Sequence, residues 1–191
     1  PEEILNLIRD AKTSENDHVG AIWEAGVQFG TVGVTVGGEQ VEITTYRSET
    51  YDEDSRKPHI GFGTVLDDDL SRRDFTINAM AVRLHDRVLV DPFSGQKDLN
   101  AGVLKTPGDP ERIFSEDPLR MLRAARFVSQ LGFHVDENTF VGMTKVAQRI
   151  TIISSERISA EVTKLVEGAQ PHEGAHVLWS SGVGEHVFHA G

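Results

Sequence analysis

Residues 72–79 read Arg-Arg-Asp-Phe-Thr-Ile-Asn-Ala, and residues 116–127 read Glu-Asp-Pro-Leu-Arg-Met-Leu-Arg-Ala-Ala-Arg-Phe. Both segments place charged side chains at helical spacing among aliphatic and aromatic ones. Burying an arginine or an aspartate is costly unless each has a partner. The two segments therefore predict a polar site built into a helical core.

The second segment has a charged stripe. Asp117 and Arg120 are three residues apart, as are Arg120 and Arg123, so a helix would carry all three on one face. The simplest interpretation is a ladder of surface ion pairs, each of them weak. The neighbours Leu119 and Leu122 instead favour a helix that packs in a core.

The first segment has a related pattern. Asp74 and Asn78 are four residues apart and face together on a helix predicted over residues 74–81. An aspartate at that position also suits a helix cap, and capping is compatible with a second, functional role of the same side chain.

Composition indicates a globular protein that remains in a reducing compartment. The chain has 191 residues, 38% of them hydrophobic and 26% charged, and it contains no cysteine. Disulfides are therefore excluded, and a cytoplasmic location is expected. No apolar run approaches the roughly 20 residues of a membrane span, and no secretory signal pattern is present.

The charge distribution is uneven. A net charge of −11 argues against a free-standing nucleic-acid binder, because neutralising phosphates requires lysine and arginine. Six arginines nevertheless fall between residues 112 and 157, which predicts a local cationic surface on an acidic protein.

Periodicity divides the chain into a mixed α/β part up to about residue 92 and an all-helical part beyond it. The first part is expected to contain a helix at 1–11, a hairpin at 29–46 that turns at Gly37-Gly38, a mobile surface loop at 47–63, a helical stretch near residue 64 and a short hairpin at 82–90. The second part is expected to contain helices at 110–114, 117–131, 136–148, 155–167 and 173–180. Ser115 is predicted to cap the helix at 117–131, and Gly132 to end it.

The two charged segments resemble signatures of the class II template-independent nucleotidyltransferases, which comprise the CCA-adding tRNA nucleotidyltransferases and bacterial poly(A) polymerases. The resemblance extends from about residue 1 to about residue 168. It implies an α/β nucleotidyltransferase-type head with a mixed sheet and flanking helices over residues 1–92, an all-α neck that recognises the nucleobase over 93–168, and the start of a helical body at 169–191. The family's Gly-rich start and Asp-x-Asp metal pair have no counterpart in this sequence, which implies a head that lacks its first strands.

The resemblance assigns nucleobase recognition to the second segment, at Glu116, Asp117, Arg120 and Arg123. The chemistry is consistent, because a carboxylate accepts from the exocyclic amines of cytosine and adenine, and a guanidinium donates to ring nitrogens and carbonyls. Guanine O6 and uracil O4 would face the carboxylate lone pair to lone pair, so both bases are expected to be rejected.

The remaining assignments concern the sugar, the phosphates and the metal. The resemblance implies that Arg73 and Asp74 meet the ribose and that Asn78 lies near the sugar-phosphate region. An aspartate that accepts from the 2′-hydroxyl would select ribonucleotides. Arg56 and Lys57 resemble the basic patch of a flexible loop. The resemblance also implies that Glu42 is one carboxylate of a two-Mg²⁺ site. The alternative is a glutamate on the solvent-exposed face of a hairpin.

The expected function is Mg²⁺-dependent addition of CMP and AMP, from CTP and ATP, to the 3′ end of tRNA. Addition of AMP to RNA tails, or a non-catalytic nucleotide- or RNA-binding role, remain alternatives. Without an Asp-x-Asp pair this chain is expected to be inactive alone, and to self-associate or to pair with a separate N-terminal segment through an unpaired sheet edge. The string His172-Glu173-Gly174-Ala175-His176 matches a zinc-protease motif, but the glycine within it and the proline before it argue against that function.

Overall fold

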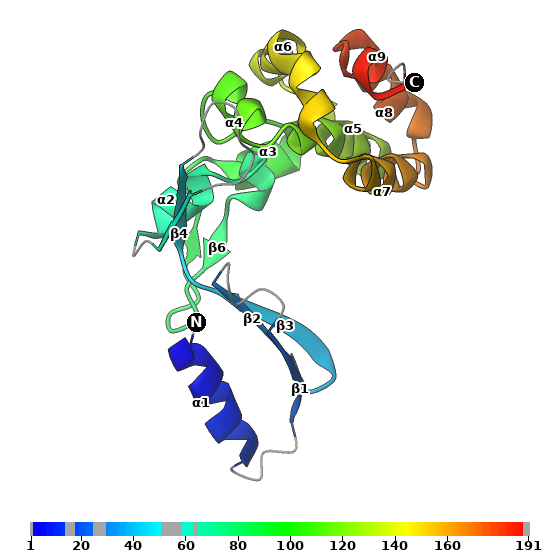
Figure 1. The fold of residues 1–191 in the computed structure, drawn as a ribbon. Coiled ribbons are helices and arrows are strands. Elements are labelled where there is room, and N and C mark those ends of the chain that lie inside the picture. Colours follow the sequence, from blue (N-terminus) through cyan, green and yellow to red (C-terminus); the bar gives the residue numbers. More distant parts are fainter. Residues whose placement is uncertain (1, 14–17, 25–29, 51–58, 63–64, 189–191) are drawn as a thin grey trace. The chain divides into compact units, whose positions relative to one another are not determined.

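The computed structural model describes residues 2–13, 18–24, 30–50, 59–62 and 65–188 (Figure 1). They form two compact units. The first contains the described residues up to Thr50 and those from 59 to Asp69, and the second contains the described residues from Leu70 onwards. In the described ranges, no helix has the length and apolar character to cross a membrane.

The first unit contains one helix and small antiparallel sheets. The helix α1 (Glu2–Thr13) has glutamates in its first turn and Lys12 in its last, which complements the helix dipole. Beside it lies a three-stranded sheet in the order β1-β2-β3, which consists of β1 (Val19–Trp23), β2 (Thr31–Val36) and β3 (Glu39–Thr44). Val36 pairs with Glu39 across the two-residue turn at Gly37-Gly38, where φ is 59° and 89°. The predicted hairpin is confirmed.

One face of this sheet has an aromatic contact at a glycine. Trp23 pairs with Gly33, and a Cβ atom at residue 33 would lie 1.8 Å from the Trp23 ring. Only glycine leaves room for the indole at that position. The adjacent residues Val32 and Val34 are buried on the opposite face, as strand alternation requires.

The prediction of a loop over residues 47–63 is wrong at both ends of this range, where the chain forms strands. The strand β4 (Arg47–Thr50) pairs antiparallel with β5 (His59–Phe62). Neither strand shows an alternating pattern, because four-residue strands are too short to establish a period and the ladder is formed by backbone groups. Arg56 and Lys57, the basic pair of this segment, lie outside the described residues.

The second unit begins inside the helix α2 (Leu66–Ser71), which contains the division between Asp69 and Leu70. The helix predicted at 74–81 is wrong, because the chain forms only a 3₁₀ turn, η2 (Thr76–Asn78), followed by the paired strands β6 (Ala81–Val82) and β7 (Leu89–Val90). The physical reason is a tertiary hydrogen bond: Thr76 N donates to the Lys105 carbonyl at 2.7 Å. The short hairpin predicted at 82–90 is confirmed.

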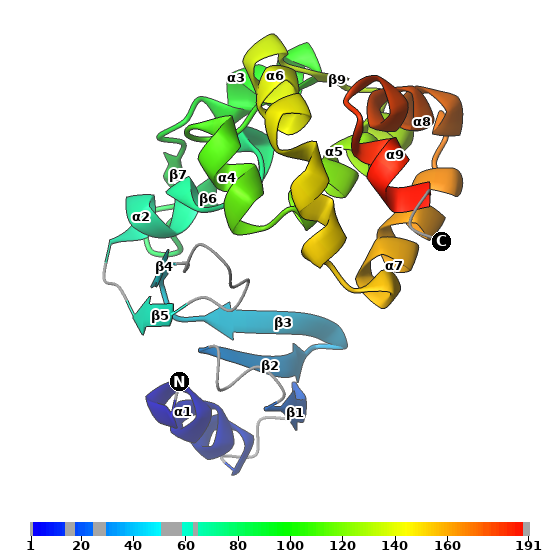
Figure 2. The ribbon, with the colours of Figure 1, turned by 45° about the horizontal axis from the view of Figure 1, so that its top comes forward.

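The rest of the second unit is mainly helical (Figures 1 and 2). The predicted helices are present, whereas the helices at 95–101 and 183–188 and a short strand pair were not predicted. The helices of this part are α3 (Gly95–Ala101), α4 (Pro110–Glu116), α5 (Leu119–Leu131), α6 (Glu137–Val146), the 3₁₀ helix η3 (Ala147–Ile152), α7 (Ser155–Val166), α8 (Pro171–Ser180) and α9 (Val183–Phe188). A parallel pair joins β8 (Val103–Leu104) to β9 (His134–Val135). The helix α5 packs against both α7 and α8, and the Trp179 ring on α8 stacks on the Phe188 ring at 5.8 Å.

The junction between α4 and α5 differs from the prediction. The second helix begins at Leu119, because Asp117 has an extended backbone with φ −136° and ψ 94°. Ser115 is not its cap but lies inside α4. The Asp117 carboxylate instead accepts from Leu119 N at 3.2 Å. Gly132 ends α5 with φ 69°, as predicted.

The core of the second unit lies around α5. Met121, Ala124 and Ala125 have no exposed surface, and Phe75 from the first charged segment belongs to the same apolar cluster. The division into compact units therefore places residues 70–92 with the helices, whereas the prediction places them in the head. The head, neck and body boundaries at residues 92 and 168 remain predictions.

We expect Gly95→Ala to lower the free energy of unfolding by about 2 kcal/mol. A Cβ atom at residue 95 would lie 2.1 Å from the Thr76 carbonyl oxygen, and a backbone group cannot move aside cheaply. Gly108→Ala is the matched control, because its Cβ atom would meet only side-chain atoms at 3.5 Å or more. Urea unfolding measures both, and equal stabilities for the two variants would contradict the prediction.

Candidate nucleotide-binding site

The two charged segments meet at Asp74, which is 6% exposed. Its Oδ1 atom accepts from Phe75 N at 2.8 Å and from Asn78 Nδ2 at 3.1 Å. Its Oδ2 atom accepts from Arg123 Nε at 2.7 Å and from the same guanidinium's NH2 at 2.5 Å. The predicted contact between Asp74 and Asn78 is confirmed, and the contact with Arg123, 49 residues away, was not predicted.

An aromatic contact accompanies this ion pair. Phe75 and Phe127 pack edge to face, with ring centroids 5.9 Å apart. The guanidinium of Arg123 lies 5.4 Å from the Phe127 centroid, and that of Arg126 lies 4.4 Å from it. Both arginines are thus within the range of cation–π attraction.

Sequence reasoning missed two further aspartates, one bonded to the 3₁₀ turn and one bonded to the start of α3. Asp98 Oδ2 accepts from the Thr76 hydroxyl at 2.7 Å. The Asp91 carboxylate accepts from Gly95 N at 2.6 Å and from Gln96 N at 3.0 Å, which satisfies the start of α3. The sequence predicts no helix over residues 95–101, so spacing does not mark Asp91 as a cap.

The predicted base-recognition residues lie at the α4–α5 junction. The Arg120 side chain is 9% exposed, and its NH1 donates to the Ile113 carbonyl at 3.2 Å and lies 3.9 Å from Glu116 Oε2. Asp117 is more accessible, with its side chain 27% exposed. Asp117 Oδ2 lies 3.5 Å from Arg157 NH2. Glu116 and Arg120 are therefore brought together, whereas the Asp117 carboxylate pairs with Arg157 and the Arg123 guanidinium pairs with Asp74.

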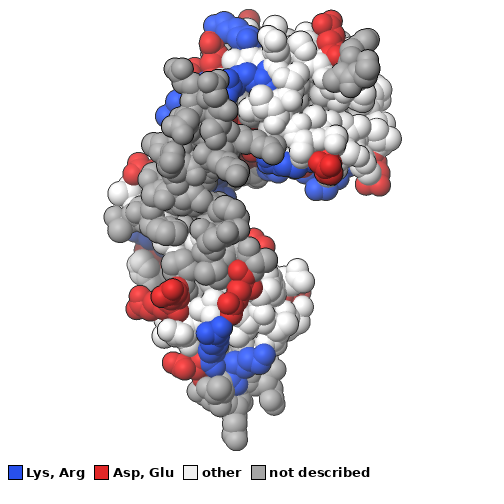
Figure 3. Space-filling view, in the orientation of Figure 1, with Lys and Arg blue, Asp and Glu red and all other residues white. Residues whose placement is uncertain are grey.

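A second arginine supports this junction from η3, since Arg149 Nε donates to the Ser115 carbonyl at 3.2 Å. With Arg157 it forms part of the cationic cluster predicted for residues 112–157. Figure 3 shows Lys and Arg side chains at several places on the second unit, interspersed with Asp and Glu side chains. Two of the six arginines, Arg120 and Arg126, are buried, and three others pair with carboxylates, so the local cationic surface stays a prediction.

A buried ion pair joins α5 to α7, and it too was missed. Arg126 and Glu161 are 8% and 6% exposed, and Arg126 NH1 lies 3.3 Å from Glu161 Oε1 and 3.2 Å from Oε2. Burial lowers the pKa of the Arg126 guanidinium, an effect that the Glu161 carboxylate opposes. Among the described residues, Arg126 Nε and Glu161 Oε2 find no hydrogen-bond partner. The pair is therefore desolvated and only partly satisfied.

The candidate metal ligand lies in the first unit. Glu42 is exposed on β3 and pairs with Gly33, which has no side chain to cover the carboxylate. Over the described ranges, no three carboxylate, imidazole or thiolate groups lie close enough to hold a metal ion. Glu42 supplies one ligand at most, so the described residues do not by themselves fit a two-metal site.

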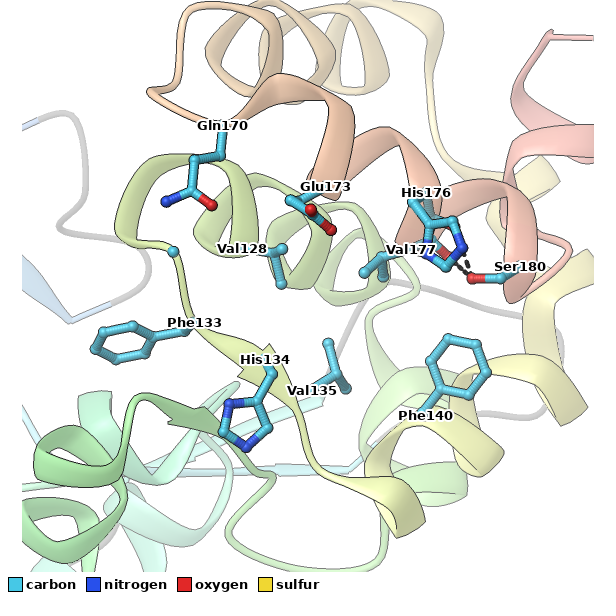
Figure 4. Close-up of a pocket in the computed structure, with 11 residues that line it drawn as sticks. Val128, Phe133, His134, Val135, Phe140, Gln170, Glu173, His176, Val177 and Ser180 are labelled. Carbon is cyan, nitrogen blue, oxygen red and sulfur yellow. Dashed lines mark hydrogen bonds between the residues drawn. The ribbon is translucent and has the colours of Figure 1, made fainter.

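A separate cleft of about 430 Å³ opens between α5, β9, α6 and α8 (Figure 4). Phe133, Phe140 and Val177 line its apolar part, and Glu173 and His176 line its polar part. Both polar residues belong to the zinc-protease-like string, which lies on α8. That string forms no three-ligand group within the described part of the chain.

Comparison with known proteins identifies the family. Residues 9–105, just over half of the chain, match the poly(A) polymerase head domain. The chain belongs to this family. Residues 132–190 match a second model, described as a probable RNA- and SrmB-binding site of polymerase A.

The named relatives to which this chain is similar are CCA-adding enzymes. The enzyme of Lactobacillus helveticus is 47% identical over 150 residues, which cover 78% of this chain and 37% of the relative. The Bacillus stearothermophilus enzyme, solved in complex with CTP, superposes with a TM-score of 0.76 at 34% identity, over 86% of this chain and 39% of that one. The Thermotoga maritima enzyme, solved with a tRNA, superposes with a TM-score of 0.75 at 26% identity, over 97% and 42%. The chain thus spans about two fifths of the relatives' length.

Proposed function

We propose that the full-length protein is a tRNA nucleotidyltransferase that adds CMP and AMP to the tRNA 3′ end. The observation that carries the proposal is the α4–α5 junction, which holds an accessible carboxylate, Asp117, and, three residues later, the Arg120 guanidinium anchored to the Ile113 carbonyl. Relatives that match most of this chain are CCA-adding enzymes, which supports the same reaction.

The junction suits the two bases that such a reaction incorporates. Asp117 Oδ2 has one long contact, to Arg157, so it retains lone pairs for an exocyclic amine of cytosine or adenine. Arg120 is fixed by Glu116 and by the Ile113 carbonyl, which orients its remaining donors toward a base. A guanidinium held in this way loses little conformational entropy when a base binds.

The proposal extends to domains, cofactor and partner. Residues 1–92 would act as the head, 93–168 as the base-recognising neck and 169–191 as the start of the body that holds RNA. Arg73, which precedes Asp74, and the basic pair Arg56 and Lys57 would contact the bound nucleotide. Mg²⁺ would be the cofactor of the full-length protein, with Glu42 as one of its oxygen ligands.

A poly(A) polymerase is the second candidate, because both matching family models carry that name. The two reactions differ in base choice and in length of product. A CCA-adding enzyme uses CTP and ATP and stops after a defined addition, whereas a poly(A) polymerase adds AMP alone and repeatedly.

Incubating the full-length protein with Mg²⁺, labelled CTP and ATP, and tRNA that lacks its CCA end tests the proposal. We expect both labels to enter the tRNA, the product to have a defined length, and EDTA to abolish incorporation. Long tails made from ATP alone would favour the poly(A) polymerase. Nucleotide binding without incorporation would leave only the binding role.

A further inference from the structure

The three-stranded sheet of the first unit has two unlike faces. Val32 and Val34 are buried on one of them, which is the core face. On the other face, Trp23 of β1 and Glu42 of β3 both pair with Gly33 of β2. Residues directly opposite each other in an antiparallel ladder project to the same face, so these three form one row across the sheet. We call it the cross-strand row.

The Trp23 indole lies flat on this row. A Cβ atom at residue 33 would be 1.8 Å from Cε2, 2.0 Å from Nε1 and 2.3 Å from Cζ2 of the indole. Because Cε2 joins the two rings and has no free edge, Gly33 can come this close to it only through the face of the ring. One ring face therefore covers Gly33, and the opposite face points away from the sheet. The Trp23 side chain is partly exposed.

The ligand that fits this face is flat and uncharged. The three strands contain no lysine or arginine, and the cross-strand row ends in the exposed carboxylate of Glu42, which would repel a phosphate. The hydroxyls of Thr31 and Thr44, a pair on the same face, lie 3.0 Å apart and add only neutral polar groups. An exposed indole face stacks with any nucleobase, since every base has a π-face.

The proposed function indicates which base would lie here. It assigns the base of the incoming nucleotide to Asp117 and Arg120, so that base is already accommodated. It also places Glu42 at the reaction centre. Neighbouring strands lie about 4.8 Å apart, so Trp23 is two strand spacings, or about 10 Å, from Glu42. The remaining base this close to the reacting group is the one at the 3′ end of the RNA.

We propose that the Trp23 ring is a stacking site for the 3′-terminal nucleobase of the RNA substrate, an inference that rests on the proposed function. A simpler role for the ring is to shield the Gly33 backbone, because an aromatic side chain can stabilise a strand at a glycine. The simpler role predicts a loss of stability when Trp23 is replaced, but no dependence on the base of the RNA. The two roles can therefore be separated.

The dissociation constant of the full-length protein for tRNA that lacks its CCA end tests the stack. The RNA is prepared with an intact 3′-terminal nucleotide and with one that lacks its base, and no nucleoside triphosphate is added. We expect Trp23→Leu to weaken binding of the intact RNA by about tenfold, within the range for one base stacked on an aromatic side chain. Binding of the abasic RNA should not change.

The control is Val41→Ala, which removes part of an exposed apolar side chain from the opposite face of β3, where Val41 pairs with Val34. It should change neither dissociation constant. A Trp23→Leu variant that weakens binding of both RNAs equally, or of neither, would overturn the proposal.

A second measurement needs no substitution, so it decides the matter even if Trp23→Leu does not fold. With 4-thiouridine as its 3′-terminal nucleotide, the RNA should cross-link to Trp23 under near-ultraviolet light. Cross-links confined to other residues would overturn the proposal.

Neither experiment measures nucleotide incorporation, so the stacking site and the proposed function can fail separately. Base-dependent binding through Trp23 in a protein that incorporates no nucleotide would refute the proposed function and retain the stacking site. Incorporation of CTP and ATP without base-dependent binding would refute the stacking site alone.

Discussion

Replacing Glu161 with leucine should lower the free energy of unfolding of the helical unit by about 3–5 kcal/mol. The substitution leaves the Arg126 guanidinium buried between α5 and α7 without its counter-ion. Burial already lowers the pKa of that guanidinium, because its charged form is poorly solvated there. Urea unfolding followed by circular dichroism measures the loss.

The double variant Arg126→Met with Glu161→Leu should recover most of this stability. Both partners carry a buried polar atom without a hydrogen-bond partner among the described residues, so the intact pair is not fully hydrogen-bonded. Exchanging such a pair for apolar side chains is often neutral or stabilising. Glu111→Ala is the control, because its pair with Lys145 is exposed and should contribute little to stability. A double variant as unstable as Glu161→Leu would show that the pair is needed for more than charge balance.

The second large effect concerns base choice. In the full-length protein, Asp117→Ala should relax discrimination against UTP and GTP as well as lower the rate. A hydrogen bond of this kind is worth about 1–3 kcal/mol, so the loss of selectivity should be tens-fold rather than total. Incorporation rates for all four nucleotides into tRNA that lacks its CCA end measure it.

The control for Asp117→Ala must lose a similar local bond elsewhere. Asp109 accepts from Arg112 N and caps α4, as Asp117 accepts from Leu119 N. Asp109→Ala should therefore cost comparable stability and leave base selectivity intact. Unchanged selectivity in Asp117→Ala, or an equal change in Asp109→Ala, would contradict the base-reading role.

Local spacing was sufficient to predict much of the fold. The turn at Gly37-Gly38 and the contact between Asp74 and Asn78 depend on residues close in the chain, and both are confirmed. The failures lie where a distant partner decides the backbone. Thr76 bonds to Lys105 and Asp98, and these bonds replace the helix that periodicity predicts over residues 74–81.

The site shows the same division. Its residue types followed from sequence, whereas two pairings did not: Arg123 with Asp74, and Arg126 with Glu161. These partners are 49 and 35 residues apart, so which arginine meets which carboxylate depends on how the helices pack. Spacing on one helix cannot supply that information.

The two tryptophans give each unit its own fluorophore. The chain has only Trp23 and Trp179. The Trp23 ring lies over Gly33 in the three-stranded sheet of the first unit. The Trp179 ring stacks on the Phe188 ring in the last helices of the second unit. Their emission should shift separately as each environment is lost, so Trp23→Phe and Trp179→Phe would each leave one reporter. The melting of the sheet and of the helices can thus be followed one at a time in the same chain.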